Sequence, residues 1–239
     1  MKKIVILLLV LMLTGCGQQE AVLPETTIPV PEETTAETTL PATVPTEPET
    51  EPTLPPEPEK DDVFVRVLDY IPEASQELKY ATEQNFTGQV IYPFADAYLR
   101  WGTVKKLQLV SRDLAELGLY LKIWDGFRPV SAQFFLWEVC PNPAYVANPT
   151  TGYSSHSRGN TVDLTLVDAE GNLLEMPTGF DDFSAKADRN YADCTETAAN
   201  NAKILELLME KQGFTGSSGE WWHFSDTVNY PVEREFEPN

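Results

Sequence analysis

The chain has 239 residues, and its 37 acidic side chains against 17 basic ones give a formal charge of −20 at pH 7. This charge excludes nucleic acid as an expected partner, because binding phosphates requires a basic surface that the sequence does not supply. Residues 17–60 hold ten Pro, ten Thr and ten Glu in 44 positions. Residues 1–60 contain no aromatic residue, so all 25 lie in residues 61–239. The sequence therefore predicts one folded domain, over residues 61–239, which is long enough to bury a single core.

The N-terminus has the features of a bacterial export signal. Two lysines precede an apolar run from Ile4 to Leu13, which is too short to span a bilayer, since that takes about 20 residues in a helix, but is typical of a secretory signal. Leu13-Thr14-Gly15-Cys16 resembles the lipobox, which implies cleavage before Cys16 and a diacylglycerol on its thiol. We therefore expect residues 1–16 to be a lipoprotein signal peptide ending at Cys16; the alternative is an ordinary signal peptide with an incidental cysteine.

Residues 17–60 are too polar and too rich in proline to bury a core, so a disordered Thr/Pro/Glu-rich tether is predicted. Fully extended, such a segment would reach up to roughly 140 Å at about 3.1 Å per residue. With a lipid on Cys16, the domain would be exported and held at the outer face of the cytoplasmic membrane, in an envelope of Gram-positive type. A merely solubilising tail is the other interpretation.

Within the domain, hydrophobic spacing predicts the first three elements. Apolar residues at helical spacing predict a helix over Thr103–Leu117, which Gly118 ends. Alternation over Leu119–Trp124 predicts a strand, and Val130–Val139 after Arg128-Pro129 predicts a short helix.

The second half of the domain continues with strands and a long helix. Asn160–Val167 alternates and is followed by a predicted hairpin turn at Asp168–Asn172. A helix is expected over Ala198–Gln212, and the aromatic run Trp221–Phe224 favours a strand. Because there is no regular βαβ rhythm, the predicted class is α+β, with a small central antiparallel sheet flanked by helices.

Two cysteines remain once Cys16 is assigned to the anchor. Outside the membrane Cys140 and Cys194 could form a disulfide, or both could be buried free thiols, and the sequence leaves the two alternatives open.

The two histidines of the chain lie in motifs that suggest a metal site. His156 lies in Ser154–Asp163, and His223 ends the run that begins at Gly219. A zinc hydrolase needs about three protein ligands and an open position for water, and His156, Asp163 and His223 can supply the ligands. Asp163 lies on the strand face opposite the apolar residues, where a carboxylate needs a partner unless it is solvated. We therefore expect a metal site on the sheet.

Glu220 is the candidate general base next to that site. It precedes His223 by three residues, so the two side chains would point to opposite faces of a regular strand. Both can approach one metal if Glu220 lies in a turn or at a bulge, which Ser217–Gly219 would permit.

Taken together, these motifs resemble the zinc D,D-peptidases with the Hedgehog-like fold, and more closely the D-alanyl-D-alanine dipeptidases of the VanX type. The resemblance extends from about Val65 to Phe224. It rests on Ser154-x-His156-x-x-Gly159-x-x-x-Asp163 with Glu220-x-x-His223, on Lys79–Thr82, Asn85–Gly88 and Asp125–Pro129, and on Phe180-Asp181.

The resemblance implies a role for each site residue. One Zn²⁺ would be bound by His156, Asp163 and His223, and Glu220 would be the general base. Arg128 would stabilise the oxyanion, Asp181 would hold the substrate ammonium, and Ser154 would assist at the substrate carboxylate. From the residues alone, Arg128 could instead pair with a surface carboxylate, and Asp181 could cap a helix.

The expected function is zinc-dependent hydrolysis of D-Ala-D-Ala, a small D-amino-acid peptide, in cell-wall metabolism. The chain reads Met176-Pro177-Thr178-Gly179 where the family commonly has Met-Gly-Thr, a departure next to the ammonium pocket. Export also differs from the cytoplasmic resistance enzymes and points to wall-derived peptides as substrate. The alternatives are a D,D-carboxypeptidase that trims wall stem peptides, and a non-catalytic tethered lipoprotein that binds the wall or a metal.

Overall fold

The computed structural model describes residues 54–238, so the expected signal peptide and most of the tether lie outside the described residues. Residues 54–60, at the end of the predicted tether, are mostly exposed and form no helix or strand. They are attached to the domain by Tyr70, whose hydroxyl donates to the carbonyl of Pro56 at 3.0 Å. No helix in this part of the chain combines the length and the apolar character that crossing a membrane requires.

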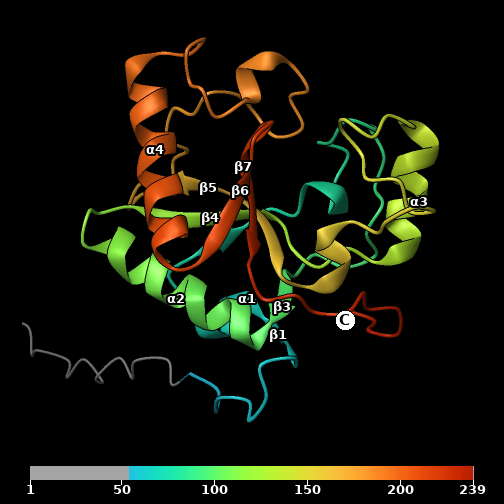
Figure 1. Cartoon of the computed structure of the whole chain (residues 1–239). Coiled ribbons are helices and arrows are strands. Elements are labelled where there is room, and N and C mark those ends of the chain that lie inside the picture. Colours follow the sequence, from blue (N-terminus) through green and yellow to red (C-terminus); the bar gives the residue numbers. More distant parts are fainter. Residues whose placement is uncertain (1–53, 239) are drawn as a thin grey trace, which may run out of the picture. The chain divides into compact units, whose positions relative to one another are not determined.

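A five-stranded sheet forms the centre of the domain (Figure 1). Its strand order is β2–β4–β5–β7–β6, and every neighbouring pair is antiparallel except the short parallel pair β2–β4. A separate antiparallel pair joins β1 to β3. The bounds are β1 Phe64–Arg66, β2 Ser75–Gln76, β3 Tyr98–Arg100, β4 Tyr120–Asp125, β5 Thr161–Val167, β6 Phe214–Ser217 and β7 Glu220–Asp226.

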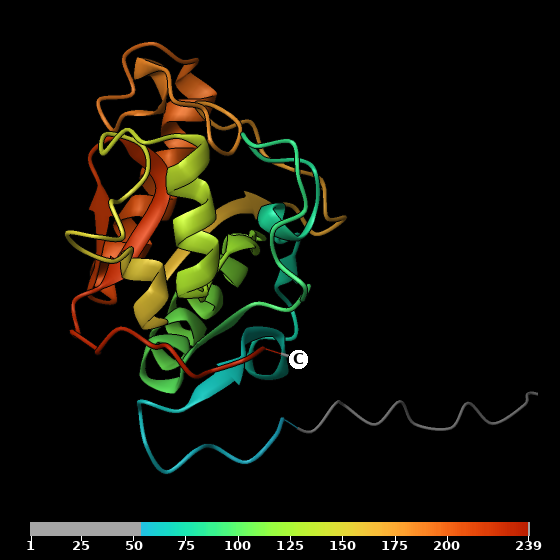
Figure 2. The same cartoon turned by 90° about the vertical axis from the view of Figure 1, so that its right-hand side faces the viewer.

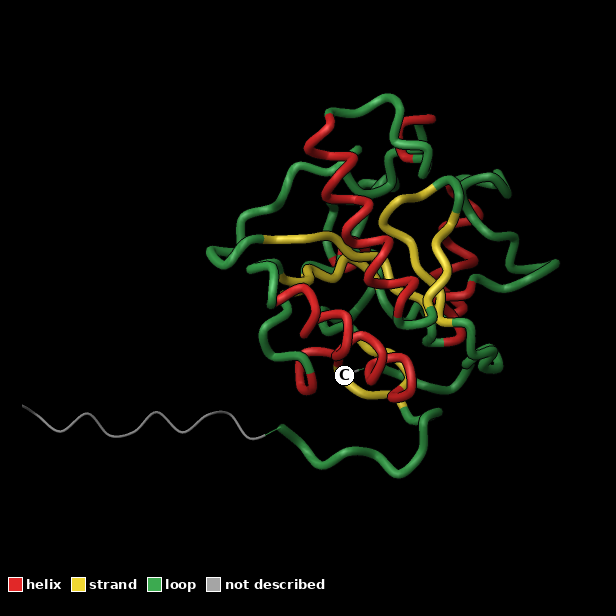
Figure 3. Tube along the Cα trace, turned by 60° about the vertical axis from the view of Figure 1, so that its left-hand side comes forward, coloured by secondary structure: helices red, strands yellow, loops and turns green. Residues whose placement is uncertain are grey.

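Helices α2 and α4 pack against each other and against the sheet, and Figure 3 shows this helical layer in front of the strands. Helix α3 lies on the other side of the domain, across the sheet from α4 (Figures 1 and 2). The bounds are α1 Val67–Tyr70, α2 Trp101–Ala115, α3 Val130–Val139 and α4 Glu196–Lys211, with short 3₁₀ turns at Lys79–Ala81, Ser155–Arg158 and Ala185–Ala187. The described part of the chain is thus an α+β domain, as predicted.

The central strand β5 is buried along its whole length. Val162, Leu164 and Leu166 belong to the hydrophobic core, together with Leu205 and Met209 of α4. Thr161, Asp163 and Thr165 point to the opposite face and are polar, yet they too are buried. One face of β5 therefore packs in the hydrophobic core with α4, and the other face presents buried polar side chains.

The predicted elements are found with ends shifted by a few residues. The helix predicted at Thr103–Leu117 begins two residues earlier as α2, and Gly118, with φ +70°, follows its end. The turn at Asp168 is present, but a single bridge from Val167 to Leu173 follows it in place of a full hairpin strand. The short strands β1, β2, β3 and β6 were not predicted, because runs of two to four residues carry too little periodicity. Cys140 and Cys194 are both free thiols.

Candidate metal centre

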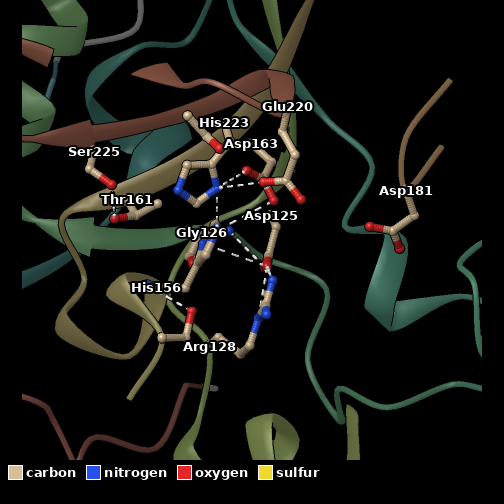
Figure 4. Close-up of polar contacts among 12 residues, drawn as sticks. Asp125, Gly126, Arg128, His156, Thr161, Asp163, Asp181, Glu220, His223 and Ser225 are labelled. Atoms are coloured by element: carbon tan, nitrogen blue, oxygen red, sulfur yellow. Dashed lines mark hydrogen bonds and ion pairs between the residues drawn. The ribbon is translucent and has the colours of Figure 1, made fainter. Parts of the chain in front are cut away.

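Two histidines and an aspartate converge at the centre of the sheet (Figure 4). His156 Nε2, His223 Nδ1 and a carboxylate oxygen of Asp163 all lie within 4.8 Å of one another. His156 Nε2 is 3.3 Å from His223 Nδ1, and Asp163 Oδ1 is 2.9 Å from the same His223 atom. Asp163 and His223 are directly paired residues of the neighbouring strands β5 and β7, so the sheet register itself places these two ligand candidates side by side.

The orientation of His156 is fixed by its own turn and by Gly126, the residue that follows β4. Ser154 Oγ accepts a hydrogen bond from the backbone N–H of His156 and caps the 3₁₀ turn Ser155–Arg158. His156 Nδ1 donates to the carbonyl of Gly126 at 2.8 Å, which leaves Nε2 as the nitrogen that faces Asp163. A second nitrogen held by a backbone carbonyl is the usual arrangement of a metal-binding imidazole, because it fixes both ring and tautomer.

The hairpin β6–β7 contains the irregularity that Glu220 requires. Gly216 pairs with Phe224, so a regular ladder would pair Ser217 with His223, but Ser217 pairs with Glu220 instead. As a result Glu220 and His223 both line the same cavity, and Glu220 Oε2 lies 3.6 Å from His223 Nδ1.

The donor set fits a zinc ion. Asp163 is 3% exposed, and its Oδ1 lies 2.9 Å from His223 Nδ1 without hydrogen-bond geometry. A buried carboxylate oxygen in this condition is costly unless a cation binds it. Burial alone would raise the pKa of Asp163, but the two imidazoles hold that pKa below its ordinary value. Two nitrogens, one carboxylate and an adjacent acid match the ligand types of catalytic zinc sites.

Arg128 lines the same cavity and is held by a buried carboxylate. Its Nε and Nη2 donate to Asp125 Oδ2 at 3.2 and 2.7 Å, and its Nη1 donates to Gln133 Oε1 at 2.9 Å. Asp125 Oδ1 in turn accepts from Tyr92 and from the backbone of Gly126. The alternative of a surface ion pair is therefore wrong, because Asp125 is 0% exposed. Burial would lower the pKa of Arg128, but Asp125 raises it well above its ordinary value, so the guanidinium stays charged.

Asp181 lies apart from the imidazoles (Figure 4) and closes another side of the cavity. Its Oδ1 accepts a hydrogen bond from Tyr80 at 3.2 Å, whereas its Oδ2 has no partner. Its backbone has φ 56°, in the left-handed region that is strained for most non-glycine residues. Burial, together with the negative charge of Asp163, raises the pKa of Asp181 to about 8. Asp181 does not cap a helix; its neighbour Asp182 accepts the backbone N–H of Ser184.

The candidate residues thus share one cavity of about 350 Å³. It is lined by Tyr80, Arg128, Ser154, His156, Asp163, Asp181, Glu220, Trp222 and His223, among others. All seven residues of the domain that the sequence motifs proposed as site residues line this cavity. Cys16 lies outside the described residues.

Three further residues of the site had not been given a role. Asp125 and Gln133 hold Arg128, and Tyr80 both contacts Asp181 and places its ring 4.9 Å from the Arg128 guanidinium. Asp125 could have been proposed from the sequence, since it precedes Arg128 by three residues in the motif Asp125–Pro129. No local pattern marks Gln133, which lies inside the apolar helix α3.

Comparison with known proteins agrees with this geometry. Residues 60–237 match the sequence profile of the peptidase M15 family, described as D-ala-D-ala dipeptidase. The D-alanyl-D-alanine dipeptidase of Escherichia coli K12 is 41% identical over 164 residues, which cover 67% of this chain and 84% of the relative. The enzyme of the same name from Enterococcus faecalis V583 is 35% identical over 170 residues, covering 61% and 82% of the two chains.

Among solved structures, the vancomycin-resistance D,D-dipeptidase VanXYg in complex with a D-Ala-D-Ala phosphinate analogue is similar at 19% identity and a TM-score of 0.37, covering 56% of this chain and 52% of that one. The family profile spans most of the chain, and the E. coli relative is covered over more than two thirds of its length. The chain therefore belongs to the peptidase M15 family of D-Ala-D-Ala dipeptidases and is a metallopeptidase.

Proposed function

We propose that the chain hydrolyses the dipeptide D-Ala-D-Ala at one zinc ion held by His156, Asp163 and His223. The observation that carries the proposal is the convergence of these three side chains within 4.8 Å, with the Glu220 carboxylate beside them. The names of the E. coli and E. faecalis relatives support the choice of substrate. When bound, a zinc ion supplies a Lewis acid that polarises the scissile carbonyl and lowers the pKa of a water.

Glu220 handles the protons of the reaction. Burial raises the pKa of its carboxyl above the ordinary value, which brings this base closer to neutral pH. In the proposed reaction Glu220 accepts a proton from the attacking water and later delivers it to the leaving amine of the C-terminal D-alanine.

Arg128 stabilises the negative charge that develops on the carbonyl oxygen. Its guanidinium is fixed by Asp125 and Gln133 before substrate arrives, so it needs little reorganisation during the reaction. A donor that is already oriented in a site shielded from water stabilises an oxyanion far better than a mobile one.

The ends of the dipeptide bind at two other groups. Asp181 Oδ2 is buried and without a partner, so it can accept the substrate ammonium, while Tyr80 keeps hold of Oδ1. The Ser154 hydroxyl lines the cavity and uses its oxygen as an acceptor for the His156 backbone, so its hydrogen is free to bind the substrate carboxylate. Asp181 and Ser154 can bind the ammonium and the carboxylate of one substrate together only if these two ends are a dipeptide's length apart. The site therefore favours a free dipeptide over a longer chain.

The direct test is an assay of the zinc-loaded full chain on D-Ala-D-Ala and on a pentapeptide ending in D-Ala-D-Ala, with Glu220→Ala as the blank. Release of D-alanine from the dipeptide alone is the expected result. Cleavage chiefly of the pentapeptide would reassign the chain as a D,D-carboxypeptidase, and no release from either substrate by a zinc-bound chain would refute the proposal.

We also propose that the enzyme works outside the cell on wall-derived peptides, attached by a lipid on Cys16. The support is the leader sequence, with its lysines, its short apolar run and Leu13–Cys16. In cells fed a labelled fatty acid, the wild-type chain should carry label and sediment with membranes. Cys16→Ala should lose the label, and a wild-type chain without label would contradict the anchor.

A further inference from the structure

The hairpin that carries Glu220 and His223 departs from regular strand geometry, and something must hold it in that form. The register shift of three residues, from Ser217–His223 to Ser217–Glu220, leaves carbonyls at the shift without their regular ladder partners. A backbone carbonyl that is shielded from water needs a hydrogen-bond donor. Ser217, Glu220 and His223 are partly buried, so a donor from outside the sheet would stabilise the irregular part of the hairpin.

That donor is Arg189, a half-buried residue in the loop before α4. Its Nε donates to the carbonyl of Ser217 at 2.6 Å, and its Nη2 donates to the carbonyls of Glu220 at 3.2 Å and His223 at 2.9 Å. The backbone N–H of Arg189 also donates to the carbonyl of Ser218 at 3.2 Å. One arginine thus binds both strands at the shift, including the backbone of the proposed base and of one proposed metal ligand.

Arg189 is itself held in place by two contacts outside the hairpin carbonyls. Its Nη1 lies 3.4 Å from Glu206 Oε1 of α4, and Tyr191 donates to the other oxygen of Glu206 at 2.8 Å. The guanidinium carbon lies 4.3 Å from the centre of the Phe224 ring. The side chain is 10% exposed, so its carbonyl contacts are shielded from water.

Gly216 provides the space for this guanidinium. A Cβ at residue 216 would lie 2.3 Å from Arg189 Cζ and 2.5 Å from Nε, far inside van der Waals contact. Its φ is not in the left-handed region, so the glycine is required here by the close approach of Arg189 and not by its backbone conformation.

We propose that Arg189 is a positioning residue, which fixes the irregular β6–β7 hairpin and so holds the Glu220 carboxylate and the His223 imidazole toward the same point. The inference rests on the proposed zinc site. A lysine cannot replace the arginine, because a single ammonium cannot span the carbonyls of Ser217 and His223 as the planar fork does.

The test compares four forms of the full chain: wild type, Arg189→Lys, Gly216→Ala and the double variant. For each we would measure the zinc dissociation constant by chelator competition, kcat and KM for D-Ala-D-Ala, and Tm. Each single variant should bind zinc about 10–100-fold more weakly and lose kcat by a similar factor, the usual size of effects from groups that orient metal ligands. KM should change less than about threefold, since Asp181 and Ser154 are untouched. The double variant should be no worse than the singles, because both changes remove the same hydrogen bonds.

Val110→Ala is the control for a general loss of stability. Val110 is 0% exposed in α2, so the truncation should lower Tm without changing zinc affinity. If Arg189→Lys kept zinc affinity and kcat within twofold of this control, Arg189 would have no positioning role. Should Arg189→Lys fail to fold, Gly216→Ala decides alone, since it displaces the guanidinium without straining the backbone. A wild-type chain that binds no zinc would instead refute the proposed function.

Discussion

The two ends of the cavity differ in how firmly the groups proposed to act on the substrate are held by the protein. At the metal end, the groups that orient the proposed ligands and the oxyanion donor are tied to fixed partners: His156 to Gly126, and Arg128 to Asp125 and Gln133. At the other end, Asp181 is buried with one bare oxygen, a strained backbone and a pKa raised to about 8.

The difference separates chemistry from recognition. Donors that are already oriented stabilise a transition state without reorganisation, so the fixed partners of Arg128 and His156 at the metal end suit the chemical step. An unsatisfied buried carboxylate is unfavourable in the free protein, and a cationic substrate end relieves that cost on binding. Substitutions at the metal end should therefore lower zinc affinity or kcat, and substitutions at Asp181 should raise KM.

The largest effect is expected from His223→Ala. This change removes one of three proposed ligands, and the cavity should then hold no stoichiometric zinc after dialysis. Metal analysis of the purified full chain checks it, with turnover expected to fall to the level of the blank. One equivalent of tightly bound zinc in the variant would remove His223 from the ligand set.

Glu220→Ala should separate metal binding from turnover. Glu220 is proposed as a base and not as a ligand, so the variant should keep about one zinc per chain. Its kcat should fall by roughly 10²–10⁴-fold, the usual contribution of a positioned general base. Measurement of zinc content and kcat on the same preparation checks both halves, and a variant that lost its zinc would show that Glu220 is a ligand.

Asp181→Asn should act on substrate binding. Replacing the carboxylate removes a charge-assisted hydrogen bond to the ammonium, which is worth about 1.5–3 kcal/mol or roughly 10–100-fold in kcat/KM. Most of the loss should appear in KM, with zinc content unchanged. A fall in kcat at constant KM would place Asp181 with the groups that act in the chemical step.

The metal end was also the part of the site that the sequence predicts best. Alternation in β5 fixed both the core face and the polar face that bears Asp163, and the i, i+3 spacing of Glu220 and His223 already required an irregular hairpin. Both inferences use local periodicity, which the chain displays directly.

The supporting contacts could not be predicted in this way. Asp125 faces Asp163 across β4 and β5, Tyr80 reaches Asp181 across 101 residues of sequence, and Arg189 meets a hairpin 28–34 residues further on. These contacts depend on strand register and loop packing, which a single sequence does not specify. The same holds for the positive φ of Asp181, since aspartate occupies ordinary φ values in most of its positions.

The last prediction concerns the stability of the metal-free chain as the pH changes. The pKa of Asp181 is about 8 in the folded chain, because burial disfavours its charge, whereas an unfolded aspartate has a pKa of about 3.9. Between these values the folded state binds more protons than the unfolded state, so this group makes stability fall as the pH rises from about 4 to about 8.

Asp181→Asn removes that titration, so its Tm relative to wild type should be lowest near pH 4 and should rise steadily until about pH 8. Thermal unfolding in the presence of a chelator, at matched ionic strength, measures the difference, and Asp193→Asn, a change at an exposed aspartate, serves as the matched control. A constant Tm difference across this range would mean that Asp181 is already ionised in the empty cavity. The contrast between the two ends of the cavity would then have to rest on the bare Oδ2 and the backbone strain of Asp181 alone.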